Sequence, residues 1–200
     1  MLLPPFIPLP ALPRIVIVYA HARPHASRIN GMLVDAARTL PNVMVQDLYE
    51  TYPDFSIDVA KEQVMLEAAD LVVTQYPVQW YSMPALLKEW LDTVFEAGWA
   101  YGKDGTALQG KGYWPVLTTG SVADAYRPNG THRHPFEAFL PALRQTAHLC
   151  GMQWLQPLVF HGAHRATQSE VVAHADRYVE MLASYPHWGN GTTDARADGK

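Results

Sequence analysis

Cysteine is almost absent from this sequence, which has Cys150 alone among its 200 residues. A disulfide within the chain is therefore excluded, and we expect a protein of a reducing compartment such as the cytoplasm. Cys150 lies in the apolar stretch Leu149-Cys150-Gly151-Met152. A cysteine in that setting is typically a small buried hydrophobic residue, so we do not expect it to act as a nucleophile.

Neither a large charge of one sign nor a long hydrophobic run is present. The formal net charge is -4, which does not indicate a surface for nucleic acid or for anionic membranes. No uncharged apolar stretch approaches the roughly 20 residues of a membrane span. Residues 1–13 are apolar and rich in proline but lack the basic flank of a signal peptide, so they are predicted to form an irregular arm. Residues 187–200 show no hydrophobic periodicity and are predicted to be a disordered tail.

Several sequence motifs of known chemistry are also missing. Neither GxGxxG nor GxxxxGK[ST] occurs, which excludes the dinucleotide fingerprint and the P-loop. The GxSxG elbow of serine hydrolases is absent as well. The pairs His132-x-His134 and His161-x-x-His164 have no cysteine or carboxylate partners at a zinc spacing. We therefore predict no metal site.

The pattern of the remaining residues indicates an alternating α/β protein. Hydrophobic residues make up 48% of the chain and charged residues 17%, which allows a sizeable core. Apolar runs rich in β-branched residues predict strands at residues 14–20, 43–48, 69–76, 113–119 and 154–161. Apolar stripes with end signals at Asp58, Gly151 and the Thr167-x-x-Glu170 capping box predict helices at residues 29–40, 58–69, 84–97, 136–150 and about 167–182. We predict one domain over residues 14–186, a doubly wound five-stranded parallel sheet with helices on both faces.

An aromatic loop, residues 77–84, follows the third predicted strand. Trp80 and Tyr81 therefore lie at the carboxyl end of that strand, where open α/β sheets bind their ligands. Pro77 and Pro84 restrict the backbone of the loop. A rigid loop with two aromatic rings suits a flat heteroaromatic ligand. The alternative, that the rings cap the core, stays open at this point.

Two further loops are expected at the same edge of the sheet. Residues 21–30 follow the first strand and place Ser27 at a helix start, where free N–H groups and the helix dipole make an anion site. A solvated first turn would give the same pattern. Thr118-Thr119-Gly120-Ser121 follows the fourth strand, and its small residues let a ring system approach the backbone. A mononucleotide with a large flat base, such as flavin mononucleotide (FMN), fits all three loops.

Five motifs in this order carry a resemblance to a known family. The motifs are the first strand with His21, Ser27-x-x-Asn30, Pro77-x-Gln79-Trp80-Tyr81-Ser82-x-Pro84, Lys88-x-Trp90-x-Asp92-x-Val94-Phe95, and Thr118-Thr119-Gly120. Together they resemble the flavodoxin-like NAD(P)H:quinone oxidoreductases, in particular the ancillary oxidoreductase subunits of glutathione-gated potassium efflux systems. The resemblance covers roughly residues 14–185, and it implies a flavodoxin-like fold with FMN as cofactor and NAD(P)H as co-substrate.

The resemblance also implies roles for individual residues. Tyr126 and His132 would form a catalytic pair that balances charge on the flavin during hydride transfer. Ser121 stands where a second glycine is usual, and a positive φ there would be strained. The flavin would be bound by His21, Ser27, Arg28, Ile29, Asn30, Val78, Gln79, Trp80, Tyr81, Thr118, Thr119, Gly120 and Ser121.

The family resemblance further implies partners. We expect a homodimer with the flavin near the interface, to which Trp90, Trp99 and Tyr101 would add apolar area. The acceptor would be a quinone, and a potassium efflux antiporter would place the protein at the inner membrane. Two alternatives stay open: an electron-carrier flavodoxin, although such carriers are usually far more acidic than -4, and a docking subunit whose catalysis is secondary.

Overall fold

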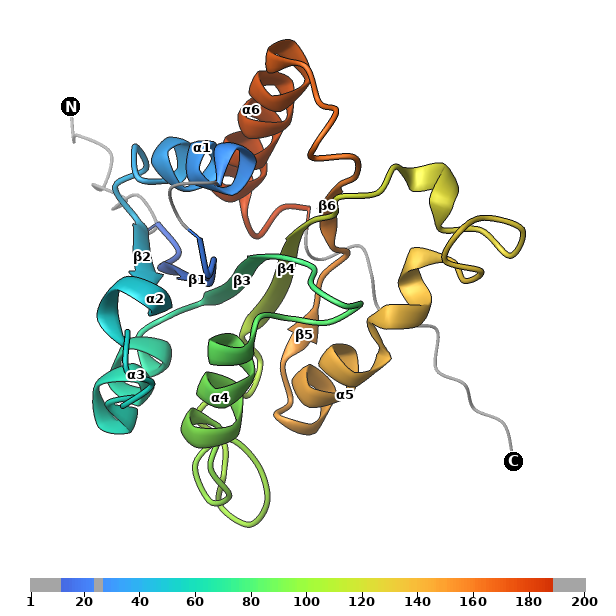
Figure 1. Ribbon diagram of the computed structural model, residues 1–200. Helices are drawn as coiled ribbons and strands as arrows, with labels where there is room; N and C mark the ends of the chain where they lie inside the picture. Colours follow the sequence, from blue (N-terminus) through green and yellow to red (C-terminus); the bar gives the residue numbers. More distant parts are fainter. Residues whose placement is uncertain (1–11, 24–26, 189–200) are drawn as a thin grey trace, which may run out of the picture.

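The structure is a computed structural model that describes residues 12–23 and 27–188. Most of the expected arm and tail lie outside the described residues. Strands and helices alternate along the chain (Figure 1). The strands are β1 (Ile15–Tyr19), β2 (Val43–Asp47), β3 (Leu71–Pro77), β4 (Gly112–Thr118), β5 (Gln153–Trp154) and β6 (Leu158–Phe160). The helices are α1 (Arg28–Ala37), α2 (Leu48–Thr51), α3 (Val59–Glu67), α4 (Ala85–Val94), α5 (Pro141–Leu149) and α6 (Gln168–Ser184), with 3-10 turns η2 (Ala123–Ala125) and η3 (Phe136–Phe139).

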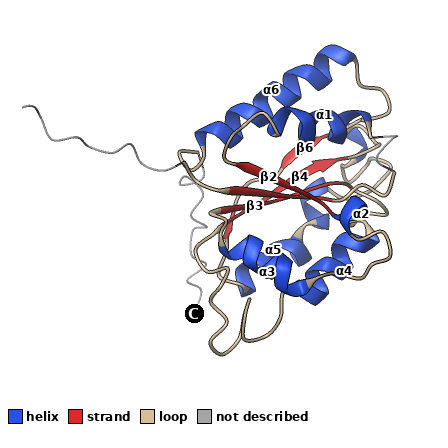
Figure 2. Cartoon of the chain, turned by 90° about the vertical axis from the view of Figure 1, so that its left-hand side faces the viewer, coloured by secondary structure: helices blue, strands red, loops and turns tan. Residues whose placement is uncertain are grey.

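The strands form one parallel sheet in the order β2-β1-β3-β4-β5, with β6 also paired to β4. Helices α1 and α6 cover one face, and α2, α3, α4 and α5 lie on the other (Figure 2). This arrangement confirms the predicted doubly wound sheet. Parallel pairing places the carboxyl ends of β1, β3 and β4 at one edge, so the loops that follow them come together there.

The fifth predicted strand, residues 154–161, is wrong as a continuous element. It is divided into β5 and β6, and both pieces pair with β4. Pro157 has no N–H to donate to the ladder. The carbonyl of Gln156 instead accepts from the Trp114 indole Nε1 at 3.0 Å. A broken edge strand with a proline is a poor template for pairing with another sheet.

Helix ends follow the predicted signals in most places. The side chains of Asp58 and Thr167 cap α3 and α6, and Thr167 and Glu170 form the expected capping box. The left-handed Gly151, with φ +67°, ends α5. The predicted helix over residues 136–150 is instead a 3-10 turn followed by α5, because Pro141 starts a new helix at its first turn. Asp47, in the strand predicted at residues 43–48, caps the short helix α2, which was not predicted.

The core has one layer on each side of the sheet. The layer beneath α1 and α6 includes Ile17, Leu33, Trp114 and Tyr178, and the ring of Trp188 packs on Trp114 with centroids 4.8 Å apart. The other layer lies between the sheet and α3, α4 and α5. Cys150 is buried there, as expected.

Trp90 belongs to this second layer and is fully buried. Its expected contribution to a dimer interface is therefore wrong, because its ring contacts the core of its own chain. The outer face of α4 carries the ion pair of Lys88 with Asp92 instead.

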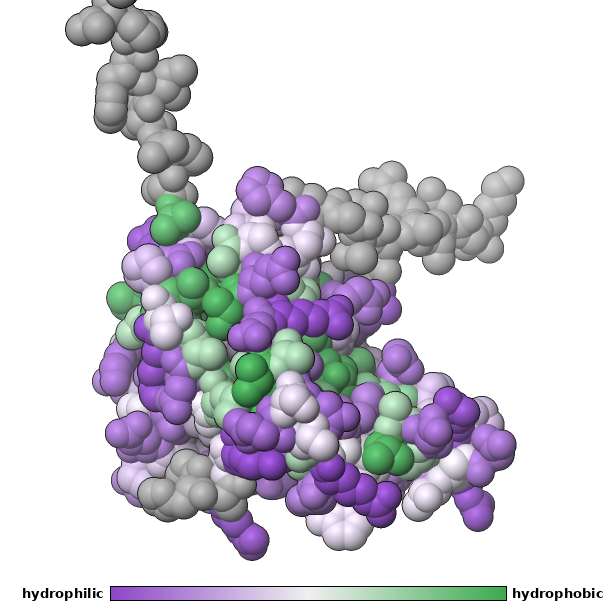
Figure 3. Space-filling model, turned by 90° about the horizontal axis from the view of Figure 1, so that it is seen from above, coloured by the Kyte–Doolittle hydropathy of each residue, from purple (hydrophilic) through white to green (hydrophobic). Residues whose placement is uncertain are grey.

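The outside of the molecule over the α1 and α6 layer shows hydrophobic clusters separated by hydrophilic side chains (Figure 3). Within the described part of the chain, none of the helices combines the length and the apolar character that a membrane crossing requires.

Candidate functional site

A cavity of about 570 Å³ lies at the carboxyl ends of β1, β3 and β4. Its volume falls within the roughly 300–1,000 Å³ of small-molecule sites. Most of the predicted cofactor-binding residues line it, namely His21, Ser27, Arg28, Ile29, Asn30, Val78, Gln79, Thr118, Thr119 and Gly120. Trp80, Tyr81 and Ser121 are not among its lining residues. The structure thus brings together the three loops that the sequence singled out.

Ser27 presents a hydroxyl donor at the start of α1. Its side-chain oxygen accepts from the Gly31 N–H at 3.1 Å and from the Tyr19 hydroxyl at 3.1 Å. A serine hydroxyl has one hydrogen and two acceptor positions. Because described residues occupy both acceptor positions, the Ser27 hydrogen can donate to a ligand. A donor at a helix N-terminus suits an anion such as a phosphate.

Cationic and imidazole groups surround this end of the cavity. Arg23, Arg28, His21 and His164 all line it. The Arg28 guanidinium is held by a hydrogen bond to the Ala166 carbonyl, in the loop before α6. Burial lowers the pKa of His21, whose Nδ1 accepts from the Arg23 N–H at 3.1 Å. The two arginines give this end of the cavity positive character.

Asn30, which also lines the cavity, carries a buried acceptor that is not used. Its side-chain Nδ2 donates to Thr118 Oγ1 at 2.8 Å, and its backbone carbonyl accepts from Gln75 Nε2 at 2.9 Å. The side chain is 3% exposed, and its Oδ1 has no hydrogen-bond partner among the described residues. A buried acceptor without a partner costs free energy. A ligand hydroxyl donated to Oδ1 would remove that cost.

The aromatic loop makes a tight, strained turn. Gln79 and Ser82 exchange two backbone hydrogen bonds of 2.9 Å, and between them Trp80 and Tyr81 have φ of 47° and 68°. Positive φ at both central positions is the type I′ pattern, in which glycine and asparagine are preferred. Trp80 is 93% exposed, so its ring does not cap the core. Strain at bulky residues is typical of functional segments, where surrounding structure maintains it.

The 118–121 wall, which consists of residues 118–121, is joined to residues 160–163 by backbone hydrogen bonds. Thr119 N donates to Phe160 O, Ala163 N to Thr119 O and Gly162 N to Ser121 O, each at 2.9 Å. The Thr119 N–H is therefore used within the protein. Ser121 is not among the residues with positive φ, so the strain considered for it does not arise.

Gly120 is the position in this wall where a side chain would interfere. A Cβ there would lie 2.9 Å from His164 Nε2 and 3.0 Å from its Cδ2, which is tighter than real contacts. Glycine therefore lets His164 lie close to the wall. Both residues line the cavity.

Tyr126 and His132 meet, as the resemblance implied. Their rings stack with centroids 4.3 Å apart, and the Tyr81 hydroxyl lies 3.3 Å from His132 Nδ1. Burial raises the pKa of Tyr126, and the Thr119 side chain opposes that shift. The Nε2 atom of His132 is buried without a partner among the described residues. The pair thus lies next to both the aromatic loop and the 118–121 wall.

Sequence reasoning missed the loop after β6. His161 contacts Thr119, Tyr126 and Phe136, and His164 lines the cavity. The signal was available, because residues that follow the fifth strand of an open sheet share the ligand-binding edge. From the sequence, these two histidines are weighed as metal ligands, and neither is assigned to the cofactor site. Among residues 12–23 and 27–188, no group of three or more His, Cys, Asp or Glu side chains is placed to hold a metal ion.

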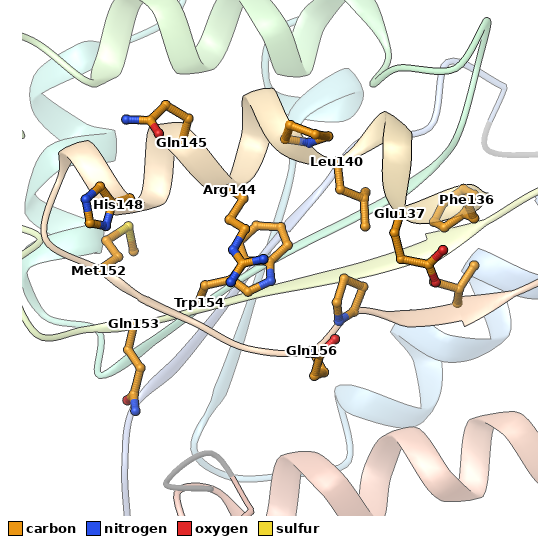
Figure 4. Close-up of a pocket in the computed structure, with 13 residues that line it drawn as sticks. Phe136, Glu137, Leu140, Arg144, Gln145, His148, Met152, Gln153, Trp154 and Gln156 are labelled. Atoms are coloured by element: carbon orange, nitrogen blue, oxygen red, sulfur yellow. The ribbon is translucent and has the colours of Figure 1, made fainter. Parts of the chain in front are cut away.

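A larger groove of about 780 Å³ runs between α5 and the broken edge strand (Figure 4). Arg144 and Trp154 point toward one another in it, and Phe136 lies at one end. None of the predicted site residues lines this groove. It touches the candidate site through Phe136, whose ring contacts Tyr126 with centroids 5.3 Å apart.

Comparison with curated proteins gives relatives along most of the chain. The chain is 44% identical over 172 residues to the glutathione-regulated potassium-efflux system ancillary protein KefG of Pectobacterium carotovorum subsp. carotovorum (strain PC1), covering 86% of this chain and 94% of that protein. It is 43% identical over 177 residues to the ancillary protein KefF of Enterobacter sp. (strain 638), covering 88% and 99%.

Solved structures are similar as well. The general stress protein 14 of Treponema denticola, in complex with FMN, has a TM-score of 0.81 at 35% identity and covers 85% of this chain and 98% of that one. A candidate quinone reductase from Klebsiella pneumoniae has a TM-score of 0.71 at 26% identity and covers 85% and 83%.

A family model described as having a flavodoxin-like fold matches residues 13–182. This range contains every residue of the cavity described above. The chain therefore belongs to this family of flavodoxin-like proteins.

Proposed function

We propose that this protein binds FMN in the cavity and transfers two electrons from NAD(P)H to a quinone or a similar small acceptor. The observation that carries the proposal is that three residues of different chemistry line one cavity: Ser27 with a donor at the start of α1, Asn30 with a buried unused acceptor, and Gly120, which has no side chain. The relatives support it, because a similar structure was solved with FMN and another is a candidate quinone reductase.

The residues present fit FMN on grounds of chemistry. Ser27 and Arg28 would hold the phosphate, Asn30 Oδ1 would accept from a hydroxyl of the ribityl chain, and the 118–121 wall would border the ring system. Trp80 and Tyr81 would cover the ring system from the aromatic loop. FMN would supply the redox chemistry, because a flavin accepts two electrons from a nicotinamide and passes them on.

The pair formed by Tyr126 and His132 would manage charge and protons. A quinone that gains two electrons must also gain two protons, of which a hydride carries one. The Tyr126 hydroxyl, the His132 ring and the Tyr81 hydroxyl form a polar group beside the site. Polar groups held in place before the reaction stabilise charge that develops in it. Tyr126 and His132 are therefore proposed as the catalytic residues.

The absorption spectrum of the purified protein tests cofactor binding. Bands at ~370 and ~450 nm identify a bound flavin, the cofactor class expected at this sheet edge. Rapid bleaching of the ~450 nm band by NADPH or NADH, and its recovery with a quinone, would support an enzyme. A flavin that neither nicotinamide reduces directly would point to an electron carrier. A colourless protein that gains no flavin on incubation with FMN would contradict the proposal.

A second role is supported by the names of the relatives, both of which are ancillary proteins of potassium efflux systems. We propose that this protein also associates with a potassium antiporter at the inner membrane. Potassium efflux from cells that express the antiporter, with and without this protein, tests the association. Efflux that is the same in both would remove this role and leave the oxidoreductase proposal untouched.

A further inference from the structure

His161 contacts two parts of the candidate site, the 118–121 wall and the proposed catalytic pair. It follows β6, and its Nδ1 lies 2.9 Å from Thr119 Oγ1. Its ring lies 5.3 Å from that of Tyr126 and meets Phe136 edge to face at 5.2 Å. Thr119 is 2% exposed and belongs to the 118–121 wall, whereas Tyr126 belongs to the proposed catalytic pair. One imidazole therefore contacts both.

The hydrogens around Thr119 can be assigned by counting. The Thr119 hydroxyl donates to the Ser121 carbonyl at 2.8 Å, and a carbonyl oxygen only accepts. A threonine hydroxyl has one hydrogen, so none remains for His161. The hydrogen bond of 2.9 Å therefore requires His161 Nδ1 to be the donor. Burial lowers the pKa of His161. The neutral ring must then be the tautomer with hydrogen on Nδ1 and a lone pair on Nε2.

This hydrogen bond adds a side-chain link to a segment already joined by its backbone. Three backbone hydrogen bonds of 2.9 Å hold residues 160–163 against the 118–121 wall. They fix the separation of the two segments but do not involve the Thr119 side chain. The donor on His161 and the acceptor on Ser121 hold that side chain in one orientation. Outer partners of this kind orient the groups that contact a ligand.

We propose that His161 is a positioning residue of the flavin site, which donates from Nδ1 to Thr119 and supports the ring of Tyr126. The inference rests on the proposed function, since the site that it positions is the proposed FMN site. The Nδ1 donor orders the 118–121 wall, and the ring keeps Tyr126 stacked on His132. His161 itself touches neither cofactor nor acceptor in this role.

Two substitutions separate the donor from the rest of the side chain. His161→Asn keeps an amide N–H close to the position of Nδ1. His161→Gln carries its amide farther out, near the position of Nε2, and leaves Thr119 without its donor. We expect FMN affinity to fall by about fivefold to tenfold in His161→Gln, the effect of one hydrogen bond, and by less than about twofold in His161→Asn. The two-electron potential of the bound flavin should shift in His161→Gln and stay near the wild-type value in His161→Asn.

The tautomer gives a test that does not depend on activity. The ¹⁵N chemical shifts of the histidine rings in the purified protein should show His161 with hydrogen on Nδ1. A double-mutant cycle with Thr119→Val should find that His161→Gln costs no further affinity once the hydroxyl is gone. His148→Gln, at an exposed position of α5, is the control and should match the wild type. Thermal unfolding of each variant shows whether it is folded.

Hydrogen on Nε2, or equal FMN affinity in His161→Gln and the wild type, would overturn the inference. So would a loss in His161→Asn as large as that in His161→Gln, because the donor would then not matter. A wild-type protein that binds no FMN would instead refute the proposed function, and the tautomer measurement would still report on His161 and Thr119.

Discussion

The indole N–H of Trp90 donates to a carboxyl oxygen of Glu62 at 2.8 Å, in a part of the core where both side chains are fully buried. The other oxygen of Glu62 accepts from the Tyr52 hydroxyl at 2.6 Å and from Gln46 Nε2 at 2.5 Å. One carboxyl group thus joins β2, the residue that follows α2, and helices α3 and α4. Burial, followed by the contact with Glu62, raises the pKa of Tyr52.

Glu62→Leu should destabilise the protein strongly. Three buried donors would lose their acceptor, and breaking such a network costs about 3–5 kcal/mol. Glu67→Leu is the matched control, because Glu67 accepts from the Trp99 indole at 2.7 Å on the exposed surface. That change should cost less than ~1 kcal/mol. Urea unfolding gives both values, and equal losses would show that burial does not set the strength of this network.

Ser27→Asp should weaken FMN binding without unfolding α1. Aspartate caps a helix as well as serine does, but its charge would oppose the phosphate in a site where Ser27 is 8% exposed. We expect a loss of about 1–3 kcal/mol in binding free energy, measured by equilibrium dialysis. Thr167→Asp changes the cap of α6 in the same way and should leave FMN affinity unchanged. Unchanged affinity in Ser27→Asp would remove this loop from the site.

His174 should make the protein less stable as the pH falls. Burial, with a smaller effect of Arg177, lowers its pKa from 6.5 to about 4. Between these values the unfolded chain binds a proton that the folded chain does not. The contribution of the neutral His174 to the free energy of unfolding is therefore fully present above pH 6.5 and is lost as the pH drops toward 4. His174→Leu should flatten this dependence in urea unfolding at pH 5 and pH 7.5. Parallel pH profiles for the variant and the wild type would contradict the assignment.

We propose that the homodimer expected from the family resemblance depends on Trp80. This ring of the aromatic loop is 93% exposed, and large aromatic residues are typical of the centre of an interface. Light scattering at micromolar concentration should return twice 22.3 kDa for the wild type. Trp80→Ser should weaken the dimer, whereas Val64→Ser, at a position 67% exposed on α3, should not. A wild-type monomer that holds flavin and turns over would refute the dimer.

The sequence predicted the order of elements well because each strand is a short apolar run with turn residues on both sides. It failed at residues 154–161, where the apolar pattern is continuous but Pro157 and the Trp114 hydrogen bond break the ladder. Trp90 shows a second limit of prediction from the sequence pattern. An apolar stripe on a helix has the same pattern whether it packs on its own core or on a partner, and the carboxyl group of Glu62 that accepts from this ring is 28 residues away.

For the candidate site, too, one part could be predicted from the sequence and another part could not. Residues at the first, third and fourth strand ends were predicted, since motif and strand end coincide there. The contacts of His161 with Thr119 and of His164 with Gly120 join segments about 40 residues apart. No local sequence pattern predicts such contacts. The type I′ turn at Trp80 and Tyr81 was also missed, because bulky aromatic residues are disfavoured in it.

His132 and Tyr126 distinguish an enzyme from an electron carrier. If they stabilise charge that develops during reduction, His132→Gln should slow turnover by roughly tenfold to a hundredfold, or ~1.4–2.8 kcal/mol of barrier, with a smaller effect on FMN binding. Tyr126→Phe should slow it less, because the ring that stacks on His132 at 4.3 Å remains. His134→Gln, at an exposed position two residues on, is the control.

Stopped-flow reduction of the flavin by NADPH, followed by reoxidation with a quinone, separates the outcomes. An electron carrier would show negligible direct reduction in the wild type, and neither substitution would change it. Rapid reduction in the wild type and in both variants would support the enzyme proposal but would show that this pair does not contribute to the reaction. A loss confined to His132→Gln would assign the role to the imidazole. The Tyr81 hydroxyl, 3.3 Å from His132 Nδ1, would then be its partner, and Tyr81→Phe should reproduce part of the loss.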